Sequence, residues 1–256
     1  AQFIAKVFNV HGPAYGISTA CSSGAKALAT ARRLIRAGVC DAVIAGGVDT
    51  ICKLTVQGFS SLQAVSDSVC NPFSKNRNGI NIGEGAALFL VTVQEKGVAL
   101  LGVGEGSDAH HISAPDPTGN GAVRCMTAAL NDADIQAQEV GYVNLHGTAT
   151  ALNDQMESLA MNKVFGSKIL CSSTKPFTGH TLGAAGAVEA AICWLMFDND
   201  APLLPVHLWD EVQDPDLPFI NLVTSDIRAD GAINYVLSNS FAFGGNNISL
   251  VLGRIQ

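Results

Sequence analysis

Hydrophobic and polar positions along the chain follow two alternating periods. Segment 24–38 ("GAKALATARRLIRAG") has apolar side chains at helical spacing and closes on Gly38, so it predicts a helix. The apolar segments on either side of it, 13–20 and 41–47, have the length of strands. A strand, a helix and a second strand are therefore expected in this order.

The same alternation continues through the rest of the chain. The Ser- and Asn-rich segment 58–81 predicts looser structure, and the Pro-rich, acidic segment 201–218 predicts a surface connection. Strands are predicted at 85–93, 98–109, within 140–150, and at 168–175, 233–241 and 247–255, and helices at 121–133, 151–166 and 182–200. Such alternation is typical of a layered α/β fold with much parallel sheet.

Composition enlarges the expected core and restricts the function classes. Of the 256 residues, 48% are hydrophobic and only 14% are charged, against about 25% charged in an average globular protein. This balance favours a large core together with a subunit interface. The net charge of −7 argues against a non-specific nucleic-acid binder, which needs a basic surface.

Neither membrane segments nor metal sites are indicated. No uninterrupted apolar run reaches the length of about 18 residues that spans a bilayer, and no secretory signal pattern is found. The seven cysteines form an odd set without a CxxC pair, so neither a disulfide framework nor a zinc site is expected. We expect a soluble protein of the reducing cytoplasm that binds no metal.

One cysteine lies where a predicted strand ends and a helix begins. In "GISTACSSGAKAL", Cys21 stands at the expected N-terminus of the helix over 24–38. Free backbone N–H groups and the helix dipole favour an anion there, so this position favours the nucleophilic thiolate. A lone cysteine is more often an ordinary buried residue, and that alternative stays open on this motif alone.

Three further strand ends carry polar or glycine-rich motifs. "NLHGTAT" contains His146, "STKPFTGHTLGAAG" contains Lys175 and His180, and "SNSFAFGGNN" places two phenylalanines before a glycine pair. Because the ends of strands in an α/β fold can converge on one crevice, these segments are plausible neighbours in space. Each motif alone is weak, since a single histidine at a strand end is more often structural.

The ordered set of four motifs resembles the β-ketoacyl-acyl-carrier-protein synthases, condensing enzymes of the thiolase superfamily. Cys21, His146, Lys175 and His180 match that family's catalytic positions. The resemblance implies a thiolase-like α/β fold of five αβαβα layers, built by duplication. It also implies that residues 1–97 are the later part of the N-terminal half and 98–256 the C-terminal half. On this basis we expect the N-terminal half to be incomplete.

The resemblance also implies a reaction, a decarboxylative Claisen condensation. Cys21 would carry the acyl chain, and the backbone N–H groups of Cys21 and Phe243 would form the oxyanion hole. His146 and His180, as neutral imidazoles, would stabilise the enolate of a malonyl unit. No cofactor is implied, because the phosphopantetheine arm arrives on the carrier protein.

Supporting roles follow from the same resemblance. Lys175 would pair with Glu189 and act electrostatically. Thr148 and Thr150 would bind the pantetheine arm, although Thr150 is equally expected to cap the next helix. Phe241 and Phe243 would gate the acyl pocket, and gating is placed in doubt by Ala242 and Asn246, which stand where the family commonly has Gly and Thr.

Several other polar residues are expected to be ordinary. Asp154 and Glu157 could orient loops near His146, but a solvated helix face is their default interpretation. The Arg32, Arg33 and Arg36 side chains are expected to complement the dipole at the end of their helix. Docking of a carrier protein is the less expected role. His110 and His111, near Asp108, suggest a loop pair rather than a metal site.

The expected partners are acyl-carrier protein and a second synthase subunit. The resemblance implies a homodimer, or a heterodimer with a related subunit, in which the strand over 13–20 pairs across a two-fold axis. The segment 66–88 is similar to synthases of aryl polyene clusters, which makes that pathway a hypothesis. The intact Cys21, His146 and His180 speak against a non-catalytic partner subunit. The two histidine motifs together speak against a synthase or thiolase acting on coenzyme A thioesters, whereas a purely structural fragment stays open.

Overall fold

Two β-sheets form the frame of the molecule, whose computed structural model describes residues 1–198, 202–225, 227–229 and 231–255. The smaller sheet pairs β1 (Ala42–Asp49) with β2 (Gly85–Thr92) in antiparallel register. The larger sheet has the order β3-β8-β7-β4-β5-β6. Its strands are β3 (Gly97–Ser107), β4 (Val140–Asn144), β5 (Leu170–Ser172), β6 (Asn221–Leu222), β7 (Tyr235–Ala242) and β8 (Asn246–Ile255).

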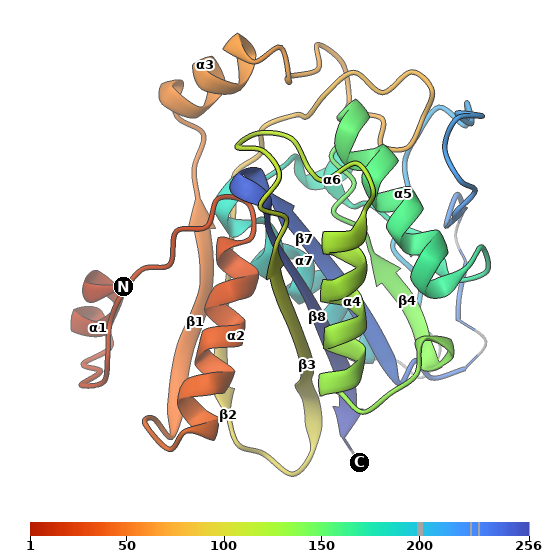
Figure 1. Ribbon diagram of the computed structural model, residues 1–256. Helices are drawn as coiled ribbons and strands as arrows, with labels where there is room; N and C mark the ends of the chain where they lie inside the picture. Colours follow the sequence, from red (N-terminus) through yellow and green to blue (C-terminus); the bar gives the residue numbers. More distant parts are fainter. Residues whose placement is uncertain (199–201, 226, 230, 256) are drawn as a thin grey trace.

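Helices separate and cover the sheets (Figure 1). The helices α2 (Ser23–Arg36) and α7 (Ala185–Leu195) lie between the two sheets, and α4 (Asn120–Asp132) and α5 (Ala151–Phe165) cover the other face of the larger sheet. The short helices are α1 (Gln2–Val7), α3 (Lys53–Ser61), α6 (Lys175–Thr178), η1 (Ala137–Glu139), η2 (Leu182–Ala184), η3 (Met196–Asp198) and η4 (Phe243–Gly245). Figure 1 shows α1 and α3 standing away from this stack.

Alternation along the central strands divides the core into two clusters. Successive side chains of a strand point to opposite faces. Val236 therefore packs toward α2 and α7, whereas its neighbour Leu237 packs toward α4 and α5. Because both faces are buried, β7 and β8 contain nearly continuous buried runs.

The helices of the central layer approach closely because their contact residues are small. A Cβ on Gly186 of α7 would lie 2.8 Å from the Ala25 Cβ of α2, and one on Gly24 would lie 2.8 Å from the Ala187 nitrogen. This contact fixes the beginning of α2 against the beginning of α7. It thereby brings two of the sequence motifs together.

Most predicted elements are confirmed, and the expectation of parallel pairing is partly met. β4 pairs in parallel with β5 and β7, as β5 does with β6, whereas β8 is antiparallel to β3 and β7. The long helix expected over 182–200 is divided into η2, α7 and η3, and its last two positions lie outside the described residues.

Two predictions were wrong. Segment 13–20 is extended but forms no strand: Thr19 bridges Cys21, and among the described residues no neighbouring strand pairs with it. Segment 201–218 is more than a surface connection, because Leu204 and His207 on it are buried.

The described residues supply four of the five expected layers. No helical layer among them covers the outer face of the β1–β2 sheet, where Val48, Leu88 and Leu90 are exposed. Within the described ranges, no helix is long and apolar enough to cross a membrane.

Candidate active site

Cys21 lies in a tight turn at the beginning of α2. Side-chain oxygens hold this turn: Ser22 Oγ donates to the Thr19 carbonyl at 2.7 Å, and the Thr19 N–H donates to Ser23 Oγ at 2.9 Å. Ala20 has a left-handed backbone with φ +51°, which is uncommon for a residue with a Cβ. The turn leaves the Cys21 side chain 7% exposed, at the wall of a cavity.

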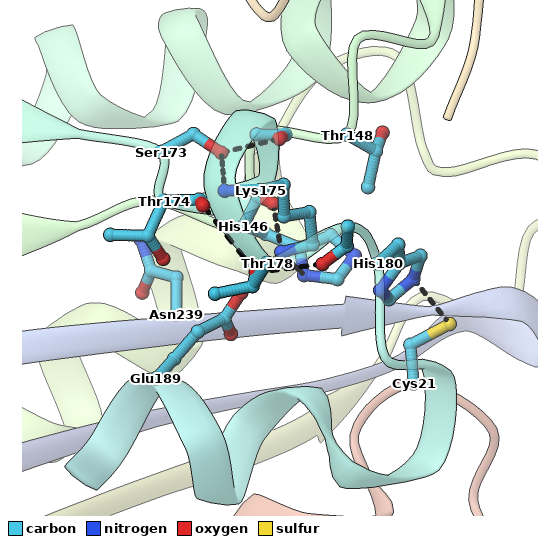
Figure 2. A network of polar contacts seen from close by, with 12 residues as sticks. Cys21, His146, Thr148, Ser173, Thr174, Lys175, Thr178, His180, Glu189 and Asn239 are labelled. Carbon is cyan, nitrogen blue, oxygen red and sulfur yellow. Dashed lines mark hydrogen bonds and ion pairs between the residues drawn. The ribbon is translucent and has the colours of Figure 1, made fainter. Parts of the chain in front are cut away.

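His180 faces the cysteine from the loop before α7. Its Nε2 lies 3.1 Å from the Cys21 Sγ (Figure 2). Its backbone is held on both sides, because its N–H donates to the Asn81 carbonyl at 2.7 Å and its carbonyl accepts from the Gly83 N–H at 3.0 Å. The segment at Gly83 approaches the backbone before His180 so closely that it requires glycine, since a Cβ on Gly83 would lie 2.2 Å from the Thr178 carbonyl oxygen.

His146 completes the group from the loop after β4. Its ring lies edge-on to that of His180, with centroids 5.3 Å apart, and contacts the ring of Phe241 at 6.0 Å. The Glu157 carboxylate accepts from the backbone N–H groups of His146 at 2.8 Å and Gly147 at 2.7 Å. The loop is therefore fixed by a buried carboxylate on α5.

Lys175 lies behind the histidines rather than in the cavity wall. Its buried ammonium forms an ion pair with Glu189, donates to the His146 carbonyl, and lies 3.5 Å from the His146 Nδ1 (Figure 2). This geometry matches the predicted Lys175–Glu189 pair. The cation therefore contacts His146 but does not line the cavity, and it acts on Cys21 and His180 through its charge.

Burial decides the protonation states of the group. It raises the pKa of the Cys21 thiol to about 11, and Lys175 opposes this rise only in part. Burial, assisted by the Lys175 charge, lowers the pKa of both His146 and His180 well below the usual range. These shifts favour a thiol beside neutral imidazoles in the resting site, in contrast to the thiolate that the helix N-terminus alone predicts.

A cavity of about 450 Å³ brings together residues from all four sequence motifs. Its wall includes Cys21, His146, Thr148, Thr150, His180, Phe241 and Phe243, together with the apolar Phe59, Leu62, Ile80 and Leu152. The polar end holds a nucleophile and two imidazoles. The apolar remainder suits a hydrocarbon chain.

The two threonines face the same way, as the spacing predicts. Thr148 Oγ1 and Thr150 Oγ1 lie 2.9 Å apart in the cavity wall. Thr150 is also the N-cap residue of α5, but its side chain makes no capping hydrogen bond. Its hydroxyl is therefore directed toward the cavity side rather than to the helix end.

Phe243 lies at the mouth of the cavity, in η4. Its ring is 39% exposed and stacks on Phe59 of α3 with centroids 5.8 Å apart. Gly244, with φ +80°, requires the freedom of glycine, whereas Ala242 has φ −130° and ψ 154°, which any residue adopts. The Ala242 methyl therefore imposes no backbone strain on the observed conformation.

The default interpretation of Asp154 and Glu157 was wrong. Both carboxylates are fully buried on the inner face of α5. Asp154 accepts from the backbone N–H groups of Phe73 at 2.8 Å and Thr148 at 3.2 Å. Burial raises the pKa of Asp154 to about 6 and that of Glu157 to about 7. Both residues orient loops, which is the alternative role predicted from their position after His146.

The arginine cluster and the adjacent pair His110 and His111 lie outside the cavity wall. Arg32 and Arg36 pair with Asp132, and Arg33 pairs with Glu105. His110 and His111 lie in an exposed loop, and no cluster in the described ranges could hold a metal ion. All seven cysteines are described, and each is a free thiol.

Two residues that support the site were missed. His207 lies buried in the segment expected to be a surface connection, and Asn81 lies in the segment expected to be loose. Neither stands in a motif of strand-end or helical spacing. Only the three-dimensional contacts give them a role.

Family models cover most of the chain. The N-terminal domain of beta-ketoacyl synthase matches residues 1–96, and the C-terminal domain matches 98–207. Relatives include the 3-oxoacyl-[acyl-carrier-protein] synthase 2 of Coxiella burnetii, 37% identical, and that of Rhizobium meliloti, 38% identical. These matches cover 97% and 96% of this chain but only 63% and 62% of the relatives' own length.

Solved structures are similar throughout. The ketosynthase ApeO of Xenorhabdus doucetiae, solved in complex with its chain length factor ApeC, superposes with a TM-score of 0.95 at 48% identity, over 99% of this chain and 63% of that one. A type II polyketide ketosynthase, solved with its acyl-carrier protein and bound to the hexaketide, gives 0.91 at 29% identity, over 99% and 66%.

Proposed function

Because the chain belongs to the β-ketoacyl synthase family and has its thiolase-like fold, we propose that it catalyses decarboxylative Claisen condensation. A Cys21-bound acyl chain and malonyl-acyl-carrier protein would give β-ketoacyl-acyl-carrier protein, in fatty-acid or polyketide elongation. The proposal rests on one observation. The Cys21 Sγ lies 3.1 Å from the His180 Nε2, and the His146 ring lies beside them in the same cavity.

Acylation is the first step. His180 Nε2 accepts the thiol proton as the Cys21 sulfur attacks the carbonyl carbon of an acyl thioester. The new S–C bond forms, the carrier thiolate leaves, and the proton returns to that leaving sulfur. The backbone N–H groups of Cys21 and Phe243 stabilise the oxyanion, a role taken from the family resemblance.

Condensation is the second step. After acylation, His180 adopts its other neutral tautomer, with the proton on Nε2. His146 and His180 then donate N–H groups to the thioester carbonyl of the malonyl unit, and both imidazoles are neutral in the buried site. The C–C bond to the carboxylate breaks, carbon dioxide leaves, and the electron pair forms an enolate. The enolate carbon attacks the acyl-cysteine, a new C–C bond forms, and the Cys21 sulfur is released and takes up one proton from water.

Supporting residues hold this arrangement. The Lys175–Glu189 pair keeps a fixed positive charge beside His146, which favours the neutral imidazole. Thr148 and Thr150 offer adjacent hydroxyls to the amides of a pantetheine arm. That arm arrives on the carrier protein, so the reaction needs no resident cofactor and no metal.

Partners follow from the relatives. The solved relatives include complexes with a chain length factor and with an acyl-carrier protein, which supports the same classes of partner here. A homodimer, or a heterodimer with a related subunit, would pair the exposed extended segment 13–20 with its counterpart. The free thiols are consistent with a reducing cytoplasm.

The domain division stays as first predicted, with residues 1–97 in the N-terminal unit and 98–256 in the C-terminal unit. The two family models meet between residues 96 and 98, which supports this boundary. A non-catalytic partner subunit is the second candidate function. The intact Cys21, His146 and His180 group disfavours it, as it disfavours a structural fragment.

Intact-mass spectrometry tests the proposal. The full-length protein is incubated with an acyl-carrier protein that bears an acyl thioester, beside its Cys21→Ala variant. We expect a mass increment equal to the acyl group, present in the wild-type protein and lost in the variant. No increment, or one retained by Cys21→Ala, would overturn the synthase mechanism and leave the partner-subunit role.

A further inference from the structure

A third buried histidine lies behind the site and takes no part in the proposed chemistry. His207 is 1% exposed, and its ring packs between Phe73 and Trp209, with centroids at 6.0 and 5.8 Å. Burial lowers the pKa of His207 to about 4, so its imidazole is neutral at ordinary pH.

The two ring nitrogens of His207 bind different segments. Nδ1 accepts the backbone N–H of Ser173 at 3.0 Å, so Nε2 carries the proton and donates to the Pro72 carbonyl, also at 3.0 Å. The His207 side chain, in a single tautomer, therefore joins the end of β5 to Pro72. Pro72 directly precedes Phe73, whose N–H donates to Asp154.

Ser173 passes this constraint to the active-site loops. Its hydroxyl donates to the Gly147 carbonyl at 2.7 Å and accepts the Lys175 N–H at 3.3 Å. Gly147 directly follows His146, and the Lys175 ammonium donates to the His146 carbonyl. The positions of His146 and Lys175 thus depend on Ser173, which is held by His207.

We propose that His207 is a positioning residue for the condensation half of the reaction, acting through Ser173 on His146 and Lys175. The inference rests on the proposed function. This chain of contacts reaches His146 and Lys175 directly, whereas the His180 backbone is held by hydrogen bonds to Asn81 and Gly83. His207 therefore acts more on decarboxylation and condensation than on acylation of Cys21.

The test compares the two half-reactions in variants of His207. Acylation of Cys21 is followed by intact-mass spectrometry, and decarboxylation by release of labelled carbon dioxide from malonyl-acyl-carrier protein. His207→Phe keeps the ring but loses both hydrogen bonds. We expect acylation within about twofold of wild type and decarboxylation lower by about 100-fold, the scale of an ångström-sized misplacement of a reacting group.

Conservative variants separate the two hydrogen bonds. His207→Asn places an amide oxygen near the Nδ1 position and retains the Ser173 contact, whereas His207→Gln retains the donor to the Pro72 carbonyl. We expect His207→Asn to recover most of the decarboxylation rate and His207→Gln to recover little. This comparison also tests the positioning role of His207 if His207→Phe fails to fold.

Trp209→Phe is the matched control, since it disturbs the packing of His207 without touching its hydrogen bonds. It is expected to change both half-reactions in the same proportion. Parallel losses in the His207 variants, or unchanged decarboxylation, would overturn the inference alone. A wild-type protein that takes up no acyl group would overturn the proposed function and this inference with it.

Discussion

The protonation state of Cys21 is set by burial more than by charge. Its position before α2 and the nearby Lys175 both favour a thiolate, yet the pKa of the thiol is raised to about 11. The neighbouring imidazole, whose pKa is lowered, does not hold the proton in the resting state. Nucleophilicity therefore has to arise as the proton moves to His180 during attack.

The rate of Cys21 alkylation should consequently depend steeply on pH. Below the pKa the thiolate fraction grows about tenfold per pH unit, so alkylation by iodoacetamide should rise in that proportion between about pH 7 and pH 9. Quenched-flow alkylation with intact-mass detection measures the rate. A plateau starting near neutral pH would mean that a thiolate–imidazolium pair exists at rest.

Cys52 is the internal reference for that measurement. It is exposed, and hydrogen bonds from Thr55 lower the pKa of its thiol. It should react first at neutral pH, in the wild-type protein and in Cys21→Ala alike. Peptide mapping assigns the two sites.

The Lys175–Glu189 ion pair is almost completely buried, so each charge depends on the other for neutralisation. Lys175→Met or Glu189→Met alone should destabilise the fold by about 3–5 kcal/mol, since each leaves one buried charge unpaired. The double variant should cost less than the sum of the two.

Denaturant-induced unfolding of the four proteins gives the coupling free energy. Additive losses would show that neither charge depends on the other in the folded protein. Any loss of activity in the double variant then reports on His146, whose carbonyl and ring Lys175 contacts.

At the scale of elements, the segment 64–83 connects both histidine loops. Its Gly79 N–H donates to the Ala149 carbonyl at 2.9 Å, beside the His146 loop, and its Asn81 and Gly83 backbones hold His180. The Asn81 side chain fixes the segment itself, accepting the Cys70 N–H at 2.6 Å and donating to the Ser68 carbonyl at 2.7 Å.

Gly83→Ala should therefore separate His180 from Cys21. The added Cβ would lie 2.2 Å from the Thr178 carbonyl oxygen, so one of the two backbones must move. We expect acylation of Cys21 to fall by about 10-fold or more in the mass assay, because proton acceptance from the thiol requires hydrogen-bond distance.

Gly58→Ala on α3 is the control, because a Cβ there would meet nothing within 4 Å. Alanine is favoured over glycine inside a helix by about 1 kcal/mol, so this variant should be at least as stable as wild type and equally active. Equal acylation by Gly83→Ala would show that His180 tolerates displacement of its backbone.

Sequence reasoning recovered the elements whose own residues encode them. The helix over 24–38 is α2 because its small and apolar side chains face two partners, and the strands 85–93 and 98–109 are β2 and β3. It failed for 13–20, because an apolar extended segment becomes a strand only where a neighbour accepts its hydrogen bonds.

The residues of the candidate site also include some that the sequence predicted and some that it did not. Cys21, His146 and His180 were found because the ordered set of their motifs resembles one family, and the structure brings their side chains together. Asp154 and Glu157 were assigned to solvent because helix periodicity does not reveal that backbone N–H groups approach them. His207 was missed because both of its partners are backbone groups remote in sequence.

At the scale of the whole molecule, the distance between Cys21 and His180 is set by the central helical layer. Cys21 precedes α2 and His180 precedes α7, and these helices contact through Gly24, Ala25, Gly186 and Ala187. Both sheets pack on this layer. Any change in the α2–α7 separation is therefore transmitted to the nucleophile and its proton acceptor.

Gly186→Val should widen that contact. Even a single Cβ would lie 2.8 Å from the Ala25 Cβ and from the Ser240 Oγ, so α7 has to shift from both α2 and β7. Overpacking of this kind costs about 1–3 kcal/mol, which should appear as a lower denaturation midpoint. Acylation of Cys21 should fall together with stability.

Gly12→Ala provides a comparison, since its added Cβ would meet only the Cys40 Sγ, at an ordinary 3.9 Å. It should leave the denaturation midpoint close to that of wild type. Unchanged acylation in a destabilised Gly186→Val protein would mean that the helices can separate without moving the two side chains apart.

The pKa of the Cys21 thiol is raised, and its proton acceptor, His180, lies 159 positions away along the chain. The pair can therefore form only when the chain has folded. Before α2 and α7 dock, the sulfur has no imidazole beside it. An unfinished molecule therefore cannot capture an acyl group from its carrier through this pair. Proton transfer from Cys21 to His180 therefore becomes available only with the native packing, in the same step that removes the thiol from water.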